Sequence, residues 1–159
     1  VGVIAAGNYK SYLIRYVGKK LFKHFVEINL KADQEGDGIF KTVRSKEDFY
    51  LQLGAMAGNN LGSKDDTLVF LDEIQSYPHL MTMLKFLNED GKYRYVASGS
   101  QLGVALSQTP SVPIGSIAVQ QMFPLDFEEF LWAMGCGKEA IESMRQSFLP
   151  AARFSLHFL

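Results

Sequence analysis

The feature that most constrains the fold is a continuous apolar run, Thr67–Leu71, which ends in two acids, Asp72 and Glu73. A strand that is apolar on both faces is typical of a parallel sheet covered by helices on both sides. Such sheets bind ligands at the carboxyl ends of their strands, where these two acids would emerge. The same string also fits a buried strand whose acids only solvate a loop, and taken alone it leaves both interpretations open.

Predicted helices and strands alternate along the rest of the chain. Apolar periodicity predicts helices near 10–24, 45–56, 76–87, 126–135 and 138–149, and strands at 25–30, 93–98 and 116–122. The polar stretch Ala32–Val43 is expected to be loop, and Pro150 is expected to interrupt the last helix. Alternating strands and helices predict an α/β fold with a mostly parallel sheet in a three-layer sandwich.

Capping pairs support two of these helices. Ser45 precedes Asp48 by three residues, and Asp126 precedes Glu129 by the same spacing. In this arrangement each side chain accepts a hydrogen bond from the backbone of the other. We therefore expect helices to begin directly after Ser45 and Asp126.

Composition excludes several classes of protein. The formal net charge of the 159 residues is −1, so there is no global positive field for nucleic acid. The one cysteine, Cys136, excludes an internal disulfide and a thiolate metal cage. No apolar run approaches the roughly 18 residues of a membrane span, so no membrane partner is indicated and a cytoplasmic location is expected. Basic residues gather early in the chain, where a solvated helix face is favoured over a binding patch: Lys10, Arg15, Lys19, Lys20 and Lys23.

The start of the chain partly fits a phosphate-binding loop. Such a loop has glycines whose neighbouring N–H groups surround phosphate, followed by Lys and Ser or Thr opening a helix. Lys10-Ser11 opens a predicted helix, and Gly2 and Gly7 have the required mutual spacing. Asn8-Tyr9 intervenes before Lys10, so the motif is broken. Three explanations stay open: a degenerate loop, a loop that closes around an insertion, and a first segment that departs from the native one.

A second polar group follows the next strand. The strand at 93–98 ends in Ser98, Gly99 and Ser100. A serine here can contact a terminal phosphate held between neighbouring strands, and Ser98 and Ser100 are both candidates. Ser100 equally fits the N-cap of a following helix, and the two roles are compatible.

Together these segments resemble the prokaryotic AAA-type ATPases whose core is followed by a C-terminal domain of unknown function. The resemblance covers about Lys10 to Gly135. It rests on KSYLIRYVGKKLFKHFVEINL, TLVFLDEIQSYPHLMTMLKFL, YVASGSQL and MFPLDFEEFLWAMG. Within the last segment, FPLDFEEFL is the most specific string, because generic ATPase chemistry does not require it.

The resemblance implies a three-layer α/β/α P-loop NTPase sandwich with strands ordered 5-1-4-3-2, and it implies ATP and Mg²⁺ as ligands. It divides the chain into a core, 1–135, and the start of a truncated helical C-terminal region, 136–159. It assigns nucleotide binding to Gly7, Lys10, Ser11 and Ser100, magnesium to Ser11 and Asp72, and activation of the attacking water to Glu73.

Two departures from the family pattern favour weak catalysis. The phosphate loop lacks its last glycine, and Gly115-Ser116 stands where the family often has Gly-Arg. Loss of that arginine removes a group that could stabilise transition-state charge. The expected function is a magnesium-dependent ATPase, and the alternative is a nucleotide-blind interaction or regulatory module on the same fold. The apolar end of the chain is then expected to self-associate or to dock a missing C-terminal domain.

Several other residues are expected to be structural. The three histidines, His24, His79 and His157, are scattered, so no metal site is predicted from them, and Cys136 has no nearby base that would activate it. The printed chain has no starter methionine, and we expect it to be part of a longer one. The following side chains are expected in the core: Met81, Met83, Phe123, Phe127, Phe130 and Trp132.

Overall fold

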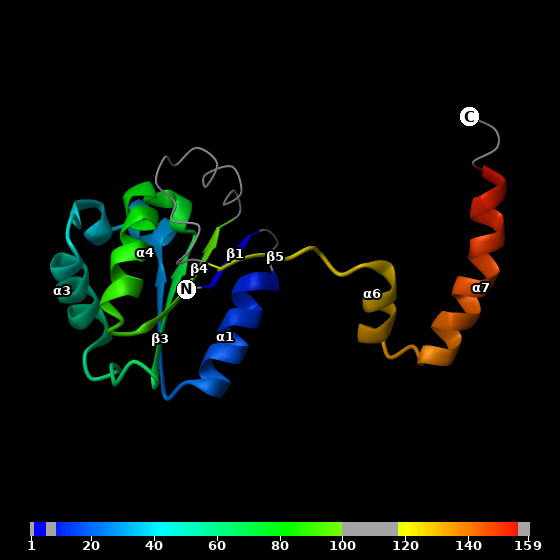
Figure 1. The fold of residues 1–159 in the computed structure, drawn as a ribbon, viewed down its shortest axis with the longest axis horizontal. Coiled ribbons are helices and arrows are strands. Elements are labelled where there is room, and N and C mark those ends of the chain that lie inside the picture. The colour runs from blue at the N-terminus through cyan, green and yellow to red at the C-terminus, as the bar shows by residue number, and fades with distance from the viewer. Residues whose placement is uncertain (1, 6–8, 100–117, 156–159) are drawn as a thin grey trace. The chain divides into compact units, whose positions relative to one another are not determined.

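The structure, a computed structural model, describes residues 2–5, 9–99 and 118–155 (Figure 1). The chain separates into two compact units, Val1–Met122 and Phe123–Leu159. Residues 123–135 group with the second unit, and the predicted division after residue 135 stays a prediction.

The first unit contains a parallel five-stranded sheet in the order β2-β3-β4-β1-β5. Read from the opposite edge, this is the order 5-1-4-3-2. The strands are β1 (Gly2–Ala5), β2 (His24–Asn29), β3 (Thr67–Asp72), β4 (Arg94–Gly99) and β5 (Ala118–Gln121). All six residues of β3 are buried, as the apolar run predicted, and β2 lies at the sheet edge.

Helices cover both faces of this sheet (Figure 1). One face packs against α2 (Leu30–Glu35), α3 (Lys46–Ala57) and α4 (Pro78–Asp90), and the buried core includes Met81 and Met83 as predicted. The other face packs against α1 (Tyr9–Leu21), where Ile14 and Gly18 are buried. The pair Ser45 and Asp48 forms the predicted capping box at the start of α3.

The prediction that Ala32–Val43 is a loop was wrong. The stretch contains most of α2 and a 3₁₀ helix, η1 (Ile39–Thr42). The Asp33 carboxylate accepts hydrogen bonds from the backbone N–H groups of Ile39 and Phe40 and from the Tyr77 hydroxyl. Phe40 is thereby held fully buried, so a single acid organises a segment whose composition is typical of loop.

The second unit consists of α6 (Phe127–Ala133) and α7 (Lys138–Ser155). The capping box of Asp126 and Glu129 is present at the start of α6, as predicted. The prediction that Pro150 interrupts the last helix was wrong, because α7 continues through it to Ser155. A proline inside a helix loses one backbone hydrogen bond and clashes with the preceding turn, and here that cost does not end the helix.

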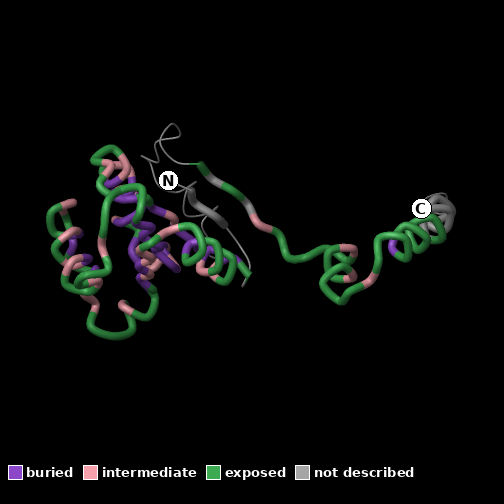
Figure 2. Tube along the Cα trace, turned by 90° about the horizontal axis from the view of Figure 1, so that it is seen from below, coloured by how far each residue is buried: buried purple, intermediate pink, exposed green. Residues whose placement is uncertain are grey.

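The aromatic residues expected to be core in this unit are exposed. Phe123 is 74% exposed and Trp132 is 50% exposed. Figure 2 shows buried residues concentrated along the sheet of the first unit, while α6 and α7 are mostly exposed. The prediction was wrong because helical spacing identifies a common face without identifying what covers it. The exposed aromatic side chains are Phe123, Phe127, Phe130 and Trp132.

No helix among the described residues combines the length and the apolar character needed to cross a membrane.

Candidate functional site

The strand ends β3 and β4 and the first turn of α1 bring polar side chains together at the carboxyl edge of the sheet. Asp72 closes β3 and is only 4% exposed. Its Oδ1 atom accepts a hydrogen bond of 2.9 Å from the Ser11 hydroxyl. Ser98, near the end of β4, donates a second bond to the same oxygen and is fully buried. The structure thus brings Ser11, in the first turn of α1, into direct contact with Asp72 at the end of β3.

Local sequence explains why these groups meet. Side chains alternate along a strand, so Phe70 and Asp72 project toward the same face of the sheet. The Phe70 ring lies 6.3 Å from that of Phe25 on β2, between centroids and tilted by 34°, on the side of the sheet covered by α1. Gly18 of α1 lies against the Phe25 ring, so α1 approaches the sheet closely there. The first turn of α1 then brings Ser11 to the end of β3.

Lys10 is buried beside the acids, at 3% exposed. Its Nζ donates a hydrogen bond of 2.9 Å to the carbonyl oxygen of Gly99. Burial lowers the pKa of the Lys10 ammonium, and the carboxylates of Glu73 and Asp72 oppose that shift. A buried ammonium has three donors, and such a group is suited to binding an anion that enters between the strands.

Glu73 has an unusual backbone conformation. Its φ is 57°, and it is the only non-glycine with positive φ among the described residues. It stands at the N-terminus of the 3₁₀ helix η2 (Ile74–Ser76), and its carboxylate accepts a hydrogen bond from Gln75. The left-handed region costs a non-glycine residue about 1–2 kcal/mol. Residues held in such conformations cluster at functional sites, so the strain agrees with a functional position for Glu73.

Two charged residues missed by sequence reasoning complete the cluster. Arg15 binds the carboxylate of Glu27 on β2 through Nε and Nη2, and its Nη2 lies 3.5 Å from Asp72 Oδ2. Arg15 is only half-exposed, although its neighbouring lysines favour a solvated helix face. Its spacing of four residues from Ser11 was a usable signal, because residues at i and i+4 share a helix face.

Two predicted site residues, Gly7 and Ser100, lie outside the described residues, as do Gly115-Ser116 and His157. Of the two candidate serines, Ser98 lies on β4 and donates a hydrogen bond to Asp72.

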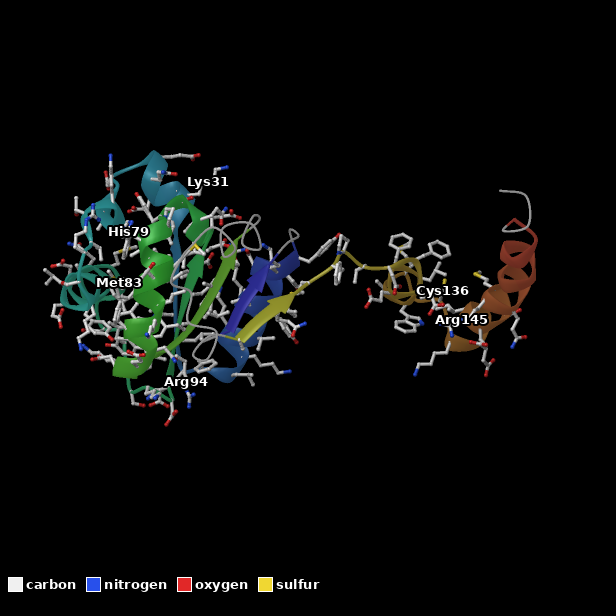
Figure 3. The ribbon with its side chains drawn as sticks, turned by 45° about the horizontal axis from the view of Figure 1, so that its top comes forward. Lys31, His79, Met83, Arg94, Cys136 and Arg145 are labelled. Atoms are coloured by element: carbon white, nitrogen blue, oxygen red, sulfur yellow. The ribbon has the colours of Figure 1, made fainter. Side chains whose placement is uncertain are left out.

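The histidine and cysteine side chains that the structure describes lie outside the polar cluster around Asp72. His79 on α4 contacts the carbonyl oxygen of Phe40, and burial lowers its pKa. A hollow of about 360 Å³ lies beside it, and none of its lining residues belongs to the polar cluster. Figure 3 shows His79 and Met83 on α4, Arg94 at the amino end of the sheet and Cys136 in the second unit. Within the described part of the chain, no group of three or more His, Cys, Asp or Glu residues could hold a metal ion.

A protein-family model described as an AAA domain matches residues 7–131. The chain belongs to the AAA domain family. The match includes the first turn of α1, the two acids at the end of β3 and most of α6. It identifies an AAA-type, P-loop NTPase-like domain. No curated protein matches the chain. Membership of this family indicates a nucleotide-binding function for the domain.

Proposed function

We propose that this AAA domain binds ATP with Mg²⁺ at the carboxyl edge of β3 and β4 and hydrolyses it. The observation that carries the proposal is the contact of Ser11 Oγ with Asp72 Oδ1, beside the buried Lys10. It supports a shared magnesium and phosphate site, because a hydroxyl from the first turn of a helix and a strand-end acid are the protein groups that hold Mg²⁺ in P-loop proteins.

The donor set fits magnesium. Mg²⁺ prefers oxygen ligands and is commonly bound by one or two carboxylates together with substrate phosphates. Ser11 and Asp72 would hold it, with water and phosphate oxygens completing the shell. When bound, the ion neutralises charge on the phosphate oxygens.

The protein groups would then have separate tasks. Lys10 would leave the Gly99 carbonyl and donate to the β and γ phosphates. Ser98 would keep Asp72 oriented from β4, and Ser100 and Gly7 remain proposed nucleotide contacts. Glu73 would orient the attacking water and accept its proton as the water oxygen bonds to the γ phosphorus. The bond to the β-phosphate oxygen breaks in the same displacement, leaving ADP and phosphate.

Calorimetric titration with ATP and Mg²⁺ tests the proposal. We expect the wild-type chain to bind, and Lys10→Ala to bind roughly 10- to 100-fold more weakly, because one charged hydrogen-bonding group is removed. Lys19→Ala is the matched control, since Lys19 is an exposed cation on the same helix. Glu73→Gln should bind normally and hydrolyse at least about 100-fold more slowly. A folded wild-type chain that does not bind would contradict the proposal.

A second candidate function is a nucleotide-blind interaction module. It is favoured by Asn8-Tyr9, which separates Gly7 from Lys10, and by the bond that Lys10 already makes to Gly99. Self-association or docking to a further domain would then be the task of the chain. The same titration separates the two functions, because this candidate predicts no heat of ATP binding from a folded protein.

A further inference from the structure

Arg15 links Asp72, at the end of β3, to Glu27 on the edge strand β2. It lies on α1, one turn after Ser11, and its Nε and Nη2 atoms bind the Glu27 carboxylate at distances of 2.6–2.9 Å. Two donors on one carboxylate fix the orientation of the guanidinium plane, which a single bond would not do. Glu27 thus anchors Arg15 to β2, the edge strand.

The anchored guanidinium also reaches Asp72. Its Nη2 lies 3.5 Å from Asp72 Oδ2, while Asp72 Oδ1 accepts bonds from Ser11 and Ser98. Both oxygens of this carboxylate are therefore held, from α1 and β4. A carboxylate held at both oxygens cannot rotate without breaking a contact. Asp72 is nearly fully buried, so little water is available to replace a lost partner.

The charges of the cluster explain why an arginine is needed here. Three carboxylates, those of Glu27, Asp72 and Glu73, gather near two cations, Lys10 and Arg15. Without Arg15, Glu27 and Asp72 would face each other without a cation between them. Like charges repel, so the Asp72 carboxylate would turn away from Glu27 and lose the orientation in which Oδ1 faces Ser11.

We propose that Arg15 is a positioning residue for the magnesium site: held by Glu27, it keeps Asp72 turned so that Oδ1 faces Ser11. The inference rests on the proposed function, since it concerns the same site. Arg15 itself touches neither nucleotide nor metal in this account. Partners of metal ligands commonly change metal affinity by about 10–100-fold when they are removed.

Magnesium dependence of nucleotide binding tests this role. The affinity for a fluorescent ATP analogue is measured across a Mg²⁺ titration and again in EDTA, for the wild-type chain, Arg15→Ala, Arg15→Lys and Glu27→Gln. In Arg15→Ala we expect the Mg²⁺ concentration at half effect to rise about 10-fold, with the affinity in EDTA unchanged. Glu27→Gln should raise the Mg²⁺ concentration at half effect by less than Arg15→Ala does. Arg15→Lys should give a value between wild type and Arg15→Ala, because lysine keeps the positive charge and loses the paired donors of the guanidinium.

Lys19→Ala is the control for removing a cation from α1, and it should leave the Mg²⁺ titration unchanged. Circular dichroism identifies any variant that does not fold, and Arg15→Lys serves if Arg15→Ala is such a variant. A Mg²⁺ titration of Arg15→Ala that matches wild type, or that shows tighter Mg²⁺ binding, would overturn the role of Arg15 alone. A folded wild-type chain that does not bind the analogue would overturn the proposed function as well.

Discussion

The two faces of the sheet are built from different chemistry. On the face covered by α2, α3 and α4, large side chains such as Phe40, Phe49 and Leu80 are almost completely buried. On the face covered by α1, the buried set includes Lys10, Asp72 and Ser98, which are charged or polar. The charged and polar groups of the candidate site therefore lie on one face of the sheet, and large apolar side chains fill the other. Variants on the first face should change mainly the free energy of unfolding, and variants of the polar groups on the second should change mainly ligand binding.

The largest expected effect breaks the apolar face. Phe49 is fully buried, and its ring lies 5.9 Å from Phe40 and 6.4 Å from Tyr95 between centroids. Phe49→Ala should lower the free energy of unfolding by about 3–5 kcal/mol in a urea titration, because it leaves a cavity. Phe86→Ala is the matched control, since Phe86 is half-exposed on α4 and should cost much less. If a folded Phe49→Ala chain lost nucleotide affinity as Lys10→Ala is expected to, the two faces would not be separate.

A smaller effect tests the docking of α1. A Cβ atom at Gly18 would lie 2.5 Å from the Phe25 ring and 3.1 Å from Leu68, so the Phe25 ring or the helix would have to move. Overpacking costs about 1–3 kcal/mol, and the helix propensity of alanine offsets about 1 kcal/mol of it. Gly18→Ala should therefore lower both stability and nucleotide affinity, the second because α1 carries Ser11 and Arg15.

Gly54→Ala is the matched control for that variant. Gly54 lies inside α3, and a Cβ there meets no atom within 4 Å. The substitution should stabilise the chain by up to about 1 kcal/mol and leave binding unchanged. Equal effects of the two substitutions in urea titrations would contradict the close approach of α1 to the sheet.

A further effect is a pH dependence on the apolar face. Burial, with a further contribution from Asp33, raises the pKa of Tyr77 from 10.0 to about 12. The folded state thus keeps this proton when the unfolded state has lost it, so stability should fall as pH rises from about 10 to 12. Tyr77→Phe should make that decline shallower in urea titrations. Tyr77→Phe should not abolish the decline of stability with pH, because burial also raises the pKa of Tyr50 to about 12. An unchanged slope would contradict the assignment to Tyr77.

Much of the fold was predictable because its signals are local. The apolar run of β3 and the capping pair at Ser45 need no distant partner to be recognised, and both were confirmed. The segment containing α2 and η1 was missed because Asp33 organises it through contacts with Tyr77, a residue far away in the sequence. Polar composition gives no indication of such a contact.

Those residues of the site that follow from local sequence signals were likewise predictable. Ser11 and Asp72 follow from rules about helix starts and strand ends, and the structure brings them into contact. Arg15 and Glu27 were missed because their pairing depends on how closely α1 packs on β2, which Gly18 permits. The roles of Lys10, Ser11, Asp72 and Glu73 toward a ligand stay predictions.

The most direct test of the central claim is a crystal structure with a non-hydrolysable ATP analogue and Mn²⁺ in place of Mg²⁺, located by its anomalous scattering. We predict a single metal peak at about 2.0–2.3 Å from Ser11 Oγ, with Asp72 bound directly or through one water and the terminal phosphate beside Lys10. A nucleotide bound elsewhere on the chain, or bound at this edge with no metal peak near Ser11 and Asp72, would contradict the account.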